Sequence, residues 1–281
     1  MKIAISAEST IDLTQELIEQ NDIKVIPFFV TLGERTDEDG VITPHDIFSY
    51  VEETGVLPRT SAVNEYAYKE HFENLLKDYD AVIHLSLSSE LSSSYQNAVA
   101  ASNKLQNVHV INSKSLSTGI ALQVLYACKL RDEGKLPSEI CKAIRARRDK
   151  VQASFVVNTL SYLHKGGRCS GVTNIVGTIL RIKPQILLTT EGKMVPGKKY
   201  MGRGSKVIKA YCEDILNQFP NVDKTRVFLT HSYASEEMIQ AAKDVLASHG
   251  ITDVTVTIAN ATITSHCGPK CLGILYYTDG E

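Results

Sequence analysis

Short apolar runs alternate with amphipathic stretches through the first 150 residues. Residues 3–6, 81–85 and 108–111 are apolar runs of strand length, and the segments between them repeat apolar positions at helical spacing. This alternation predicts an α/β fold with a mainly parallel sheet covered by helices. The run at residues 25–30 contains Pro27, which predicts an edge strand or an irregular one.

Local capping signals indicate where helices begin. Thr43, Pro44 and Asp46 form a helix start, because threonine accepts hydrogen bonds from free amides, proline suits the first turn and an acid suits the positive end. Gly55 is expected to end that helix. Another helix is predicted to begin near Asp12, with its apolar side chains on one face.

The pattern changes beyond residue 150, where the elements become shorter. Residues 185–190 and 193–198 form a hairpin-like pair around a turn, and a helix is predicted after Gly204. We therefore predict two closely packed domains. An α/β domain with hydroxyl-rich loops at its strand ends covers residues 1–152, and an α+β domain covers residues 153–281 and completes a ligand pocket.

Composition limits the classes of function. Hydrophobic residues make up 43% of the 281 residues and charged residues 22%, with a net charge of −2, which is typical of a soluble globular protein. Without a basic surplus there is no electrostatic footprint for nucleic acid or an anionic membrane. The sequence contains no membrane-spanning run, and its start lacks the pattern of a signal peptide. Six cysteines in a chain this long do not resemble a disulfide framework, so we expect a reducing cytoplasm.

Hydroxyl side chains are concentrated in three predicted turns. Residues 85–95 carry six serines between a buried strand and a helix, where ligands commonly bind in open α/β sheets. Helix capping explains these serines equally well. Thr60 and Ser61 precede a helix expected from Asn64, so they are cap residues or ligand donors, with the cap favoured. Residues 112–115 occupy a similar position. We expect the three turns to meet at one edge of the sheet and to share a pocket.

Several catalytic motifs are missing from the sequence. A serine hydrolase of the α/β type needs a Gly-x-Ser-x-Gly elbow, and none is present. The dinucleotide-binding Gly-x-Gly-x-x-Gly turn and the phosphate-binding Walker lysine are also missing. Gly166, Gly167 and Arg168 are a candidate phosphate loop, but we favour a turn that follows a helix at residues 159–164.

His266, His231 and Arg203 each allow more than one role. His266 is predicted in a loop before the last strand, as a base, a metal ligand, a hydrogen-bond donor or an ordinary turn residue. Cys267 and Cys271 lie beside it, but their spacing lacks the second ligand pair of a zinc site. His231 is interpreted as structural. Arg203, between two glycines, suits contact with a partner protein as well as contact with a ligand.

Taken in order, these segments resemble the DegV family of bacterial fatty-acid-binding proteins over nearly the whole chain. The resemblance is carried by Ser9-Thr10-Ile11-Asp12-Leu13, Thr60-Ser61, the segment from Leu87 to Gln96, Leu163-His164-Lys165-Gly166-Gly167-Arg168, Ile182-Lys183-Pro184 and His266-Cys267-Gly268-Pro269. It implies a two-domain protein that buries an acyl chain, holds its carboxyl group with hydroxyls and performs no catalysis of its own.

The resemblance also implies the ligand, the partner and the site residues. The ligand is a long-chain fatty acid such as palmitate, without a metal or another cofactor, and the partner is a separate fatty acid kinase. The family's binding threonine matches Thr60 and its binding serine matches Ser92. His266 matches a histidine near the carboxyl group, and the adjacent Ser61 and Ser93 complete the predicted carboxylate site. The predicted partner contact is at Arg203.

The chain departs from the family pattern at four places. Glu8 stands where the family often has aspartate, and Asn64, after Val63, lies where a proline is expected. Ser93 and Lys270 replace usual glycines. A side chain at Ser93 bears on the carboxylate loop, so we expect the head-group geometry to be affected there.

A fatty acid suits this pattern on energetic grounds. Burying a chain of about sixteen carbons at roughly 0.8 kcal/mol per methylene contributes on the order of 10 kcal/mol. Neutral hydroxyls would orient the carboxylate without the tight ion pair of an arginine. Two alternatives remain: an enzyme acting on a small acyl or phosphorylated substrate through Ser92 or His266, and an interaction module without an interior cavity. Candidate tunnel residues, which core packing explains nearly as well, are Ile175, Val176, Ile179, Leu180 and Ile182.

Overall fold

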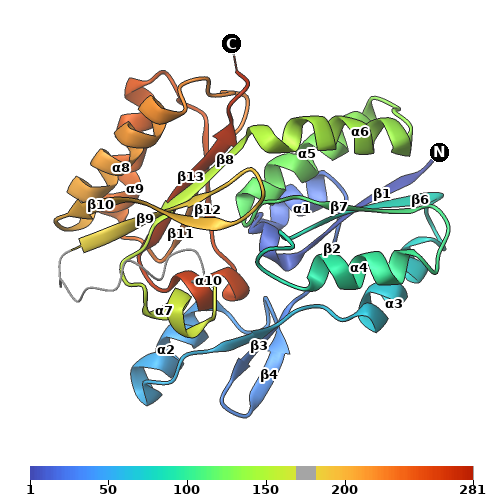
Figure 1. Cartoon of the computed structure of the whole chain (residues 1–281), viewed down its shortest axis with the longest axis horizontal. Coiled ribbons are helices and arrows are strands. Elements are labelled where there is room, and N and C mark those ends of the chain that lie inside the picture. The colour runs from blue at the N-terminus through green and yellow to red at the C-terminus, as the bar shows by residue number, and fades with distance from the viewer. Residues whose placement is uncertain (169–181, 281) are drawn as a thin grey trace.

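A computed structural model describes residues 1–168 and 182–280 of the chain (Figure 1). The first of its sheets is four-stranded and entirely parallel, as the alternating pattern predicted. Both central strands are buried on their two faces, which explains their continuous apolar runs. In spatial order the strands are β2 (Ile23–Ile26), β1 (Ile3–Glu8), β6 (Ala81–Ser86) and β7 (Val108–Asn112).

Helices cover both faces of this parallel sheet. Figure 1 shows α3 and α4 on one face and α5 and α6 on the other. The helices of this half are α1 (Gln15–Gln20), α3 (Glu65–Leu75), α4 (Ser94–Ser102), α5 (Thr118–Asp132) and α6 (Pro137–Arg147), and α6 runs into the short 3-10 turn η2 (Arg148–Lys150).

The second sheet is mixed and has six strands. Only β11 and β12 pair in parallel, while the other neighbours are antiparallel. The predicted hairpin is confirmed as the β9–β10 pair. In spatial order the strands are β10 (Met194–Met201), β9 (Ile182–Leu188), β8 (Val151–Val156), β13 (Cys271–Tyr277), β11 (Val227–Ser232) and β12 (Val254–Ile258).

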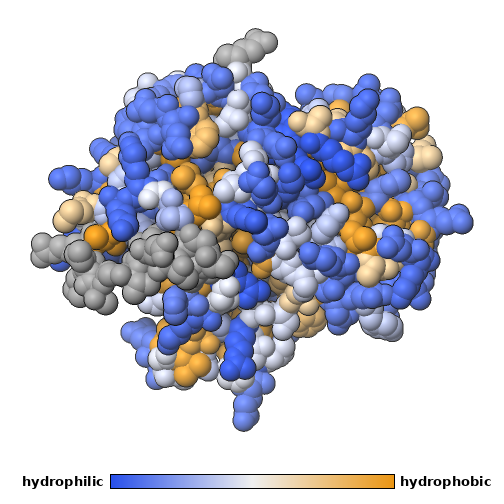
Figure 2. All heavy atoms as spheres, in the orientation of Figure 1, coloured by the Kyte–Doolittle hydropathy of each residue, from blue (hydrophilic) through white to orange (hydrophobic). Residues whose placement is uncertain are grey.

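Two long helices, α8 (Gly204–Gln218) and α9 (Glu236–Ser248), pack together and bury an apolar core against the six-stranded sheet. The predicted domain boundary at residues 152 and 153 lies inside β8, and the division into two domains stays a prediction. No helix in the described ranges is long and apolar enough to cross a membrane. The face shown in Figure 2 is mostly hydrophilic, with apolar patches separated by polar side chains.

A small third sheet and α2 (Pro44–Thr54) form a separate layer. The strands β4 (Arg35–Glu38), β3 (Phe29–Leu32) and β5 (Arg59–Ser61) are antiparallel. The apolar run at residues 25–30 breaks at Pro27 into β2 and β3, in line with its predicted irregularity. The capping box of α2 is present, with Thr43 and Asp46 bonded reciprocally and Gly55 at the end.

Two local predictions were wrong. Near Asp12 there is a short 3-10 turn, η1 (Ser9–Ile11), and Asp12 itself has a φ of +52°, so α1 begins only at Gln15 behind the cap Thr14. His266 lies in the helix α10 (Ala261–Cys267) rather than in a loop. The start of α10 is capped from a distance by Asp39, whose Oδ1 accepts a 2.8 Å hydrogen bond from the Ala261 amide. A cap so remote in sequence leaves no local signal.

Candidate functional site

A narrow cavity lies between the loops of the parallel sheet, the six-stranded sheet and α10. It encloses about 820 Å³ of atom-free space, including its opening, but little of that space is wide enough for a water molecule. Most of its wall is apolar, contributed mainly by Phe28, Leu87, Leu91, Leu116, Phe155, Leu163, Met194, Ile263 and Leu275. A space that is narrow and apolar suits an alkyl chain better than a compact polar molecule.

Four of the polar residues that line this cavity come from four separate segments. Thr60 comes from β5, Ser92 from the loop before α4, His266 from α10, and Arg168 follows α7 (Ser161–Lys165). The Thr60 Oγ1 and His266 Nε2 atoms are 2.8 Å apart, although 206 positions separate the residues in sequence. The Ser92 hydroxyl donates to Ser94 Oγ at 3.0 Å. We call these four residues the polar cluster.

His266 is neutral near pH 7. Its burial, and secondly the positive charge of Arg168, lower the pKa of the imidazole to about 4. If Nε2 accepts a hydrogen bond from the Thr60 hydroxyl, the ring hydrogen of the neutral imidazole is on Nδ1. The Nδ1 atom is buried and has no partner within the described part of the chain. If instead Nε2 donates, the Thr60 hydroxyl is free to donate elsewhere. Either tautomer leaves one donor for an anionic group.

Arg168 adds a positive charge that the sequence interpretation did not expect. Its guanidinium donates from Nε to the Leu91 carbonyl at 3.2 Å and from Nη1 to the Gly166 carbonyl at 2.7 Å. Across residues 1–168 and 182–280 it forms no ion pair with a carboxylate. We expected neutral hydroxyls to hold the carboxylate without an arginine. Because Arg168 also lines the cavity, its positive charge favours an anionic ligand. In the sequence, the Gly166-Gly167-Arg168 segment was the feature that could have identified this arginine as a ligand-binding residue.

The other predicted site residues lie elsewhere. Ser61 and Ser93 are exposed and are not among the residues that line the cavity. Arg203 is exposed at the start of α8 and lines a separate pocket. Among the predicted tunnel residues, those at positions 175, 176, 179 and 180 lie outside the described residues. Ile182 opens β9 and does not line the cavity.

The three hydroxyl-rich turns only partly meet as predicted. The turns after β6 and β7 do lie together, since the Ser88 amide donates to the Ser115 carbonyl at 3.0 Å and Asn112 Nδ2 donates to Ser89 Oγ at 2.7 Å. Thr60 instead reaches the cavity from the small antiparallel sheet, where it pairs with Val30. His231, interpreted as structural, also lines the cavity.

A buried carboxylate holds the loop that carries Ser92. Glu8 Oε1 accepts hydrogen bonds of 2.6 Å from the hydroxyls of Tyr68 and Ser86, and Oε2 accepts one of 2.9 Å from the Leu87 amide. Burial raises the pKa of Glu8, but the charge of His84 and these hydroxyls outweigh it, so the pKa lies below its usual value. The carboxylate is therefore ionised and joins β1, α3 and the end of β6.

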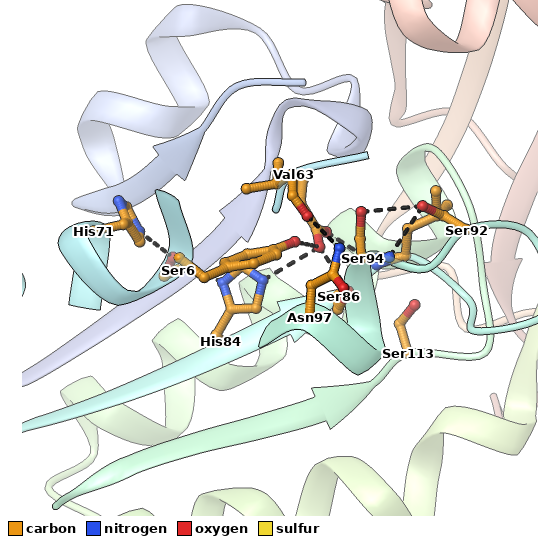
Figure 3. Close-up of polar contacts among 12 residues, drawn as sticks. Ser6, Val63, His71, His84, Ser86, Ser92, Ser94, Asn97 and Ser113 are labelled. Carbon is orange, nitrogen blue, oxygen red and sulfur yellow. Dashed lines mark hydrogen bonds and ion pairs between the residues drawn. The ribbon is translucent and has the colours of Figure 1, made fainter. Parts of the chain in front are cut away.

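The polar chain continues away from the cavity. Ser6 Oγ lies 3.0 Å from His84 Nδ1 and 2.8 Å from His71 Nε2, and His84 Nε2 lies 3.3 Å from Glu8 (Figure 3). Ser6, His84 and Glu8 have the order of a catalytic triad, but all three are fully buried. A substrate cannot reach this serine, so the arrangement acts as a structural brace.

A second link joins the elements that carry Thr60 and Ser92. Asn97 of α4 donates from Nδ2 to the Val63 carbonyl at 2.7 Å, and Val63 lies just after β5 (Figure 3). Together with Glu8, this bond ties α4 and its preceding loop to the segment that follows Thr60. The two hydroxyls are thereby held on a rigid frame, which reduces the entropy lost on ligand binding.

Ser93 and Lys270, which stand where the family usually has glycine, differ in backbone strain. Ser93 has φ −76° and ψ −1°, which any residue adopts, and its side chain is exposed. The expected constraint on the carboxylate loop is therefore not a backbone constraint. Lys270 has φ +61°, in the left-handed region where a side chain costs about 1 kcal/mol relative to glycine.

The residues beside His266 do not form a metal site. Within the described ranges no group of three or more histidine, cysteine, aspartate or glutamate side chains is arranged to hold a metal ion. Cys267 and Cys271 are both buried. A hydrogen bond with Cys267, together with burial, raises the pKa of the Cys271 thiol well above its usual value. A protonated thiol is a poor zinc ligand.

Gly166 leaves room for the His266 ring, and we expect Gly166→Ala to displace it. A Cβ atom at this position would lie 2.4 Å from His266 Nδ1 and 2.9 Å from the Tyr162 carbonyl. Affinity for an anionic ligand at the polar cluster should fall about tenfold, because overpacking of this kind costs about 1–3 kcal/mol. Isothermal titration with a long-chain carboxylate would measure it. Gly167→Ala is the control, since its Cβ meets nothing within 4 Å and its cost arises only from the positive φ of +71°; equal losses in both variants would contradict the steric explanation.

Comparisons with known proteins point to one family. The DegV family, described as uncharacterised proteins, matches residues 2–279 of the chain. A fatty acid-binding protein of Thermotoga maritima is 29% identical over 280 residues, which are 97% of this chain and 96% of that protein. The solved structure of a fatty acid-binding DegV family protein from Thermus thermophilus is 28% identical with a TM-score of 0.89, covering 99% of both chains. DegV of Bacillus subtilis, a fatty acid binding protein, is 27% identical with a TM-score of 0.85, covering 99% of both chains.

Proposed function

The chain belongs to the DegV family, and we propose that it binds a long-chain fatty acid such as palmitate, with the alkyl chain in the cavity and the carboxylate at the polar cluster. The observation that carries this proposal is the joining of a narrow apolar space to Thr60, Ser92, His266 and Arg168. Relatives from Thermus thermophilus and Bacillus subtilis, which share the fold at 27–28% identity, bind fatty acids.

The free energy of binding comes mainly from the alkyl chain. About 0.8 kcal/mol per buried methylene gives a gross gain on the order of 10 kcal/mol for a chain of about sixteen carbons. The head group must still be removed from water, which costs several kcal/mol unless it is hydrogen-bonded. The hydroxyl of Ser92, the one donor that the Thr60–His266 pair leaves free and the Arg168 guanidinium offset that cost.

In this proposal the chain is a carrier rather than an enzyme. The chemistry belongs to a cytoplasmic fatty acid kinase that phosphorylates the presented carboxylate, with Arg203 as a contact. The alternative enzyme would need Ser92 or His266 as a catalytic group. Within the described chain, the Ser92 hydroxyl donates its hydrogen bond to Ser94 Oγ, which is not a general base. The neutral, buried His266 is bonded to Thr60 instead.

Native mass spectrometry of freshly purified full-length protein tests the proposal. We expect a retained long-chain fatty acid, one per chain, that is removed by delipidation and replaced by added palmitate. Methyl palmitate is the control ligand and should bind more weakly, since it carries no charge. With kinase and ATP present, the bound mass should rise by one phosphoryl group. Failure to retain or rebind any fatty acid would contradict the carrier role, and acyl phosphate made by the kinase alone would contradict the partnership.

A further inference from the structure

A second pocket, separate from the acyl cavity, is lined by three cations and by no carboxylate. It encloses about 890 Å³ of atom-free space, including its opening, next to the starts of α8 and α9 and the end of β8. Lys183, Arg203 and Lys270 reach it from three separate segments. Its remaining wall is mostly apolar and includes Val156, Val157, Val207, Ile208 and Met238. We call this feature the basic pocket.

The three cations lack compensating charges. Within residues 1–168 and 182–280 none of them forms an ion pair, and Lys183 Nζ donates only to Asn158, to its carbonyl at 3.1 Å and its Oδ1 at 2.6 Å. By contrast, Lys198 of the β9–β10 hairpin does have a partner, since its Nζ lies 2.6 Å from Asp214 Oδ1. Burial, and secondly the charge of Lys270, lower the pKa of Lys183. The two positive groups thus disfavour each other.

The start of α8 adds to the positive potential. Gly202 and Gly204 both have positive φ, +131° and +49°, so the chain turns sharply around Arg203 before the helix begins. This helix has no side-chain cap at its start and no acidic residue in its first turn. Glu237 of α9 accepts a 2.5 Å hydrogen bond from Ser205 and does not line the pocket. The first-turn amides of α8 supplement the three side chains.

We propose that the basic pocket binds a phosphate group. Three uncompensated cations match a dianion better than a single carboxylate, and arginine and lysine together supply the planar and point-charge donors that phosphate accepts. The pocket is larger than a phosphate ion needs, and its apolar wall suits an organic remainder attached to that group. Lys270 also lies close to the acyl cavity, because its amide donates to the Ser232 carbonyl at 2.6 Å and Ser232 lines that cavity.

Pyrophosphate titration at constant ionic strength, followed by amide NMR shifts, tests this site. We expect saturable shifts near Gly202 to Ser205 in the wild type. Arg203→Gln combined with Lys270→Asn should weaken binding at least about tenfold, because it removes two of the three cations that line the pocket. Asparagine suits the positive φ at position 270. The control is Lys209→Gln with Lys243→Gln, which removes the same charge from exposed positions on α8 and α9 outside the pocket.

A second probe distinguishes the sources of the phosphate group. Flotation with phosphatidylglycerol vesicles reports binding to a lipid head group, whereas pyrophosphate reports a soluble phosphorylated molecule. If the pocket variant loses binding to one of these probes and the control variant does not, the result supports the site, and the probe that binds identifies the source of the phosphate group. Binding of neither probe, or equal weakening in both double variants, overturns it. Thermal unfolding confirms that the variants fold, and the outcome does not depend on whether palmitate binds.

Discussion

Replacing Thr60 and Ser92 together by alanine is expected to raise the Kd of palmitate by about 100-fold or more. Each hydroxyl is proposed to donate to the bound carboxylate in an apolar setting, the Ser92 hydroxyl in place of its bond to Ser94 Oγ, and a hydrogen bond to a charged group contributes about 1.5–3 kcal/mol. Thr60→Ala also removes the partner of His266 Nε2. Isothermal titration of delipidated protein at pH 7 measures the change, and unfolding by denaturant checks that the variant remains folded.

The neighbouring hydroxyls provide a matched comparison. Ser61→Ala with Ser93→Ala removes the same groups one position along, where both side chains are exposed. We expect this pair to change the Kd by less than about threefold, since neither residue lines the cavity. A loss equal to that of the first pair would restore Ser61 and Ser93 to the site. An unchanged Kd in Thr60→Ala with Ser92→Ala would remove those residues from it.

Glu8→Gln is expected to lower the free energy of unfolding by about 3–5 kcal/mol at pH 7, which is the cost of removing one partner from a buried charged network. The substitution places an amide NH2 among donors that now face a carboxylate, from Tyr68, Ser86 and the Leu87 amide. Palmitate affinity should fall as well, because the loop before Ser92 loses its anchor. Denaturant unfolding monitored by circular dichroism measures the first effect. Glu52→Gln, on the exposed face of α2, is the control.

The stability difference between wild type and Glu8→Gln depends on pH, and its direction follows from the direction in which folding shifts the pKa of Glu8. The pKa of Glu8 is lower in the folded protein than its usual value of 4.5. Its carboxylate therefore contributes stability above pH 4.5, and that contribution is lost as the pH falls through the folded pKa. The gap between wild type and Glu8→Gln should be constant near neutrality and narrow in acid. A gap that widens on acidification would contradict the assignment of an ionised Glu8.

Much of the fold could be predicted because its signals are local. The buried strands β1 and β6 appear as apolar runs, since parallel strands covered on both faces need apolar side chains throughout. The capping box of α2 lies within a few residues of the helix start. The small sheet was missed because its strands are short and β4 is polar, so neither length nor periodicity marks them.

The candidate site was predictable only in part. Thr60, Ser92 and His266 followed from the family resemblance, and the structure places all three along one cavity. Arg168 and His231 were assigned to structural roles, yet both line that cavity. A side chain's direction relative to a cavity depends on the packing of distant elements, and periodicity within one segment does not encode it.

The sequence by itself determined the alternation of strands and helices, the capped start of α2 and the family, because hydrophobic periodicity and local capping act over a few residues. Only the tertiary structure decided which side chains meet. Thr60 contacts His266 across 206 positions, and Asp39 caps α10 across 222. Such contacts form when separately specified elements pack to bury apolar surface, so the polar cluster has no signature in any one segment.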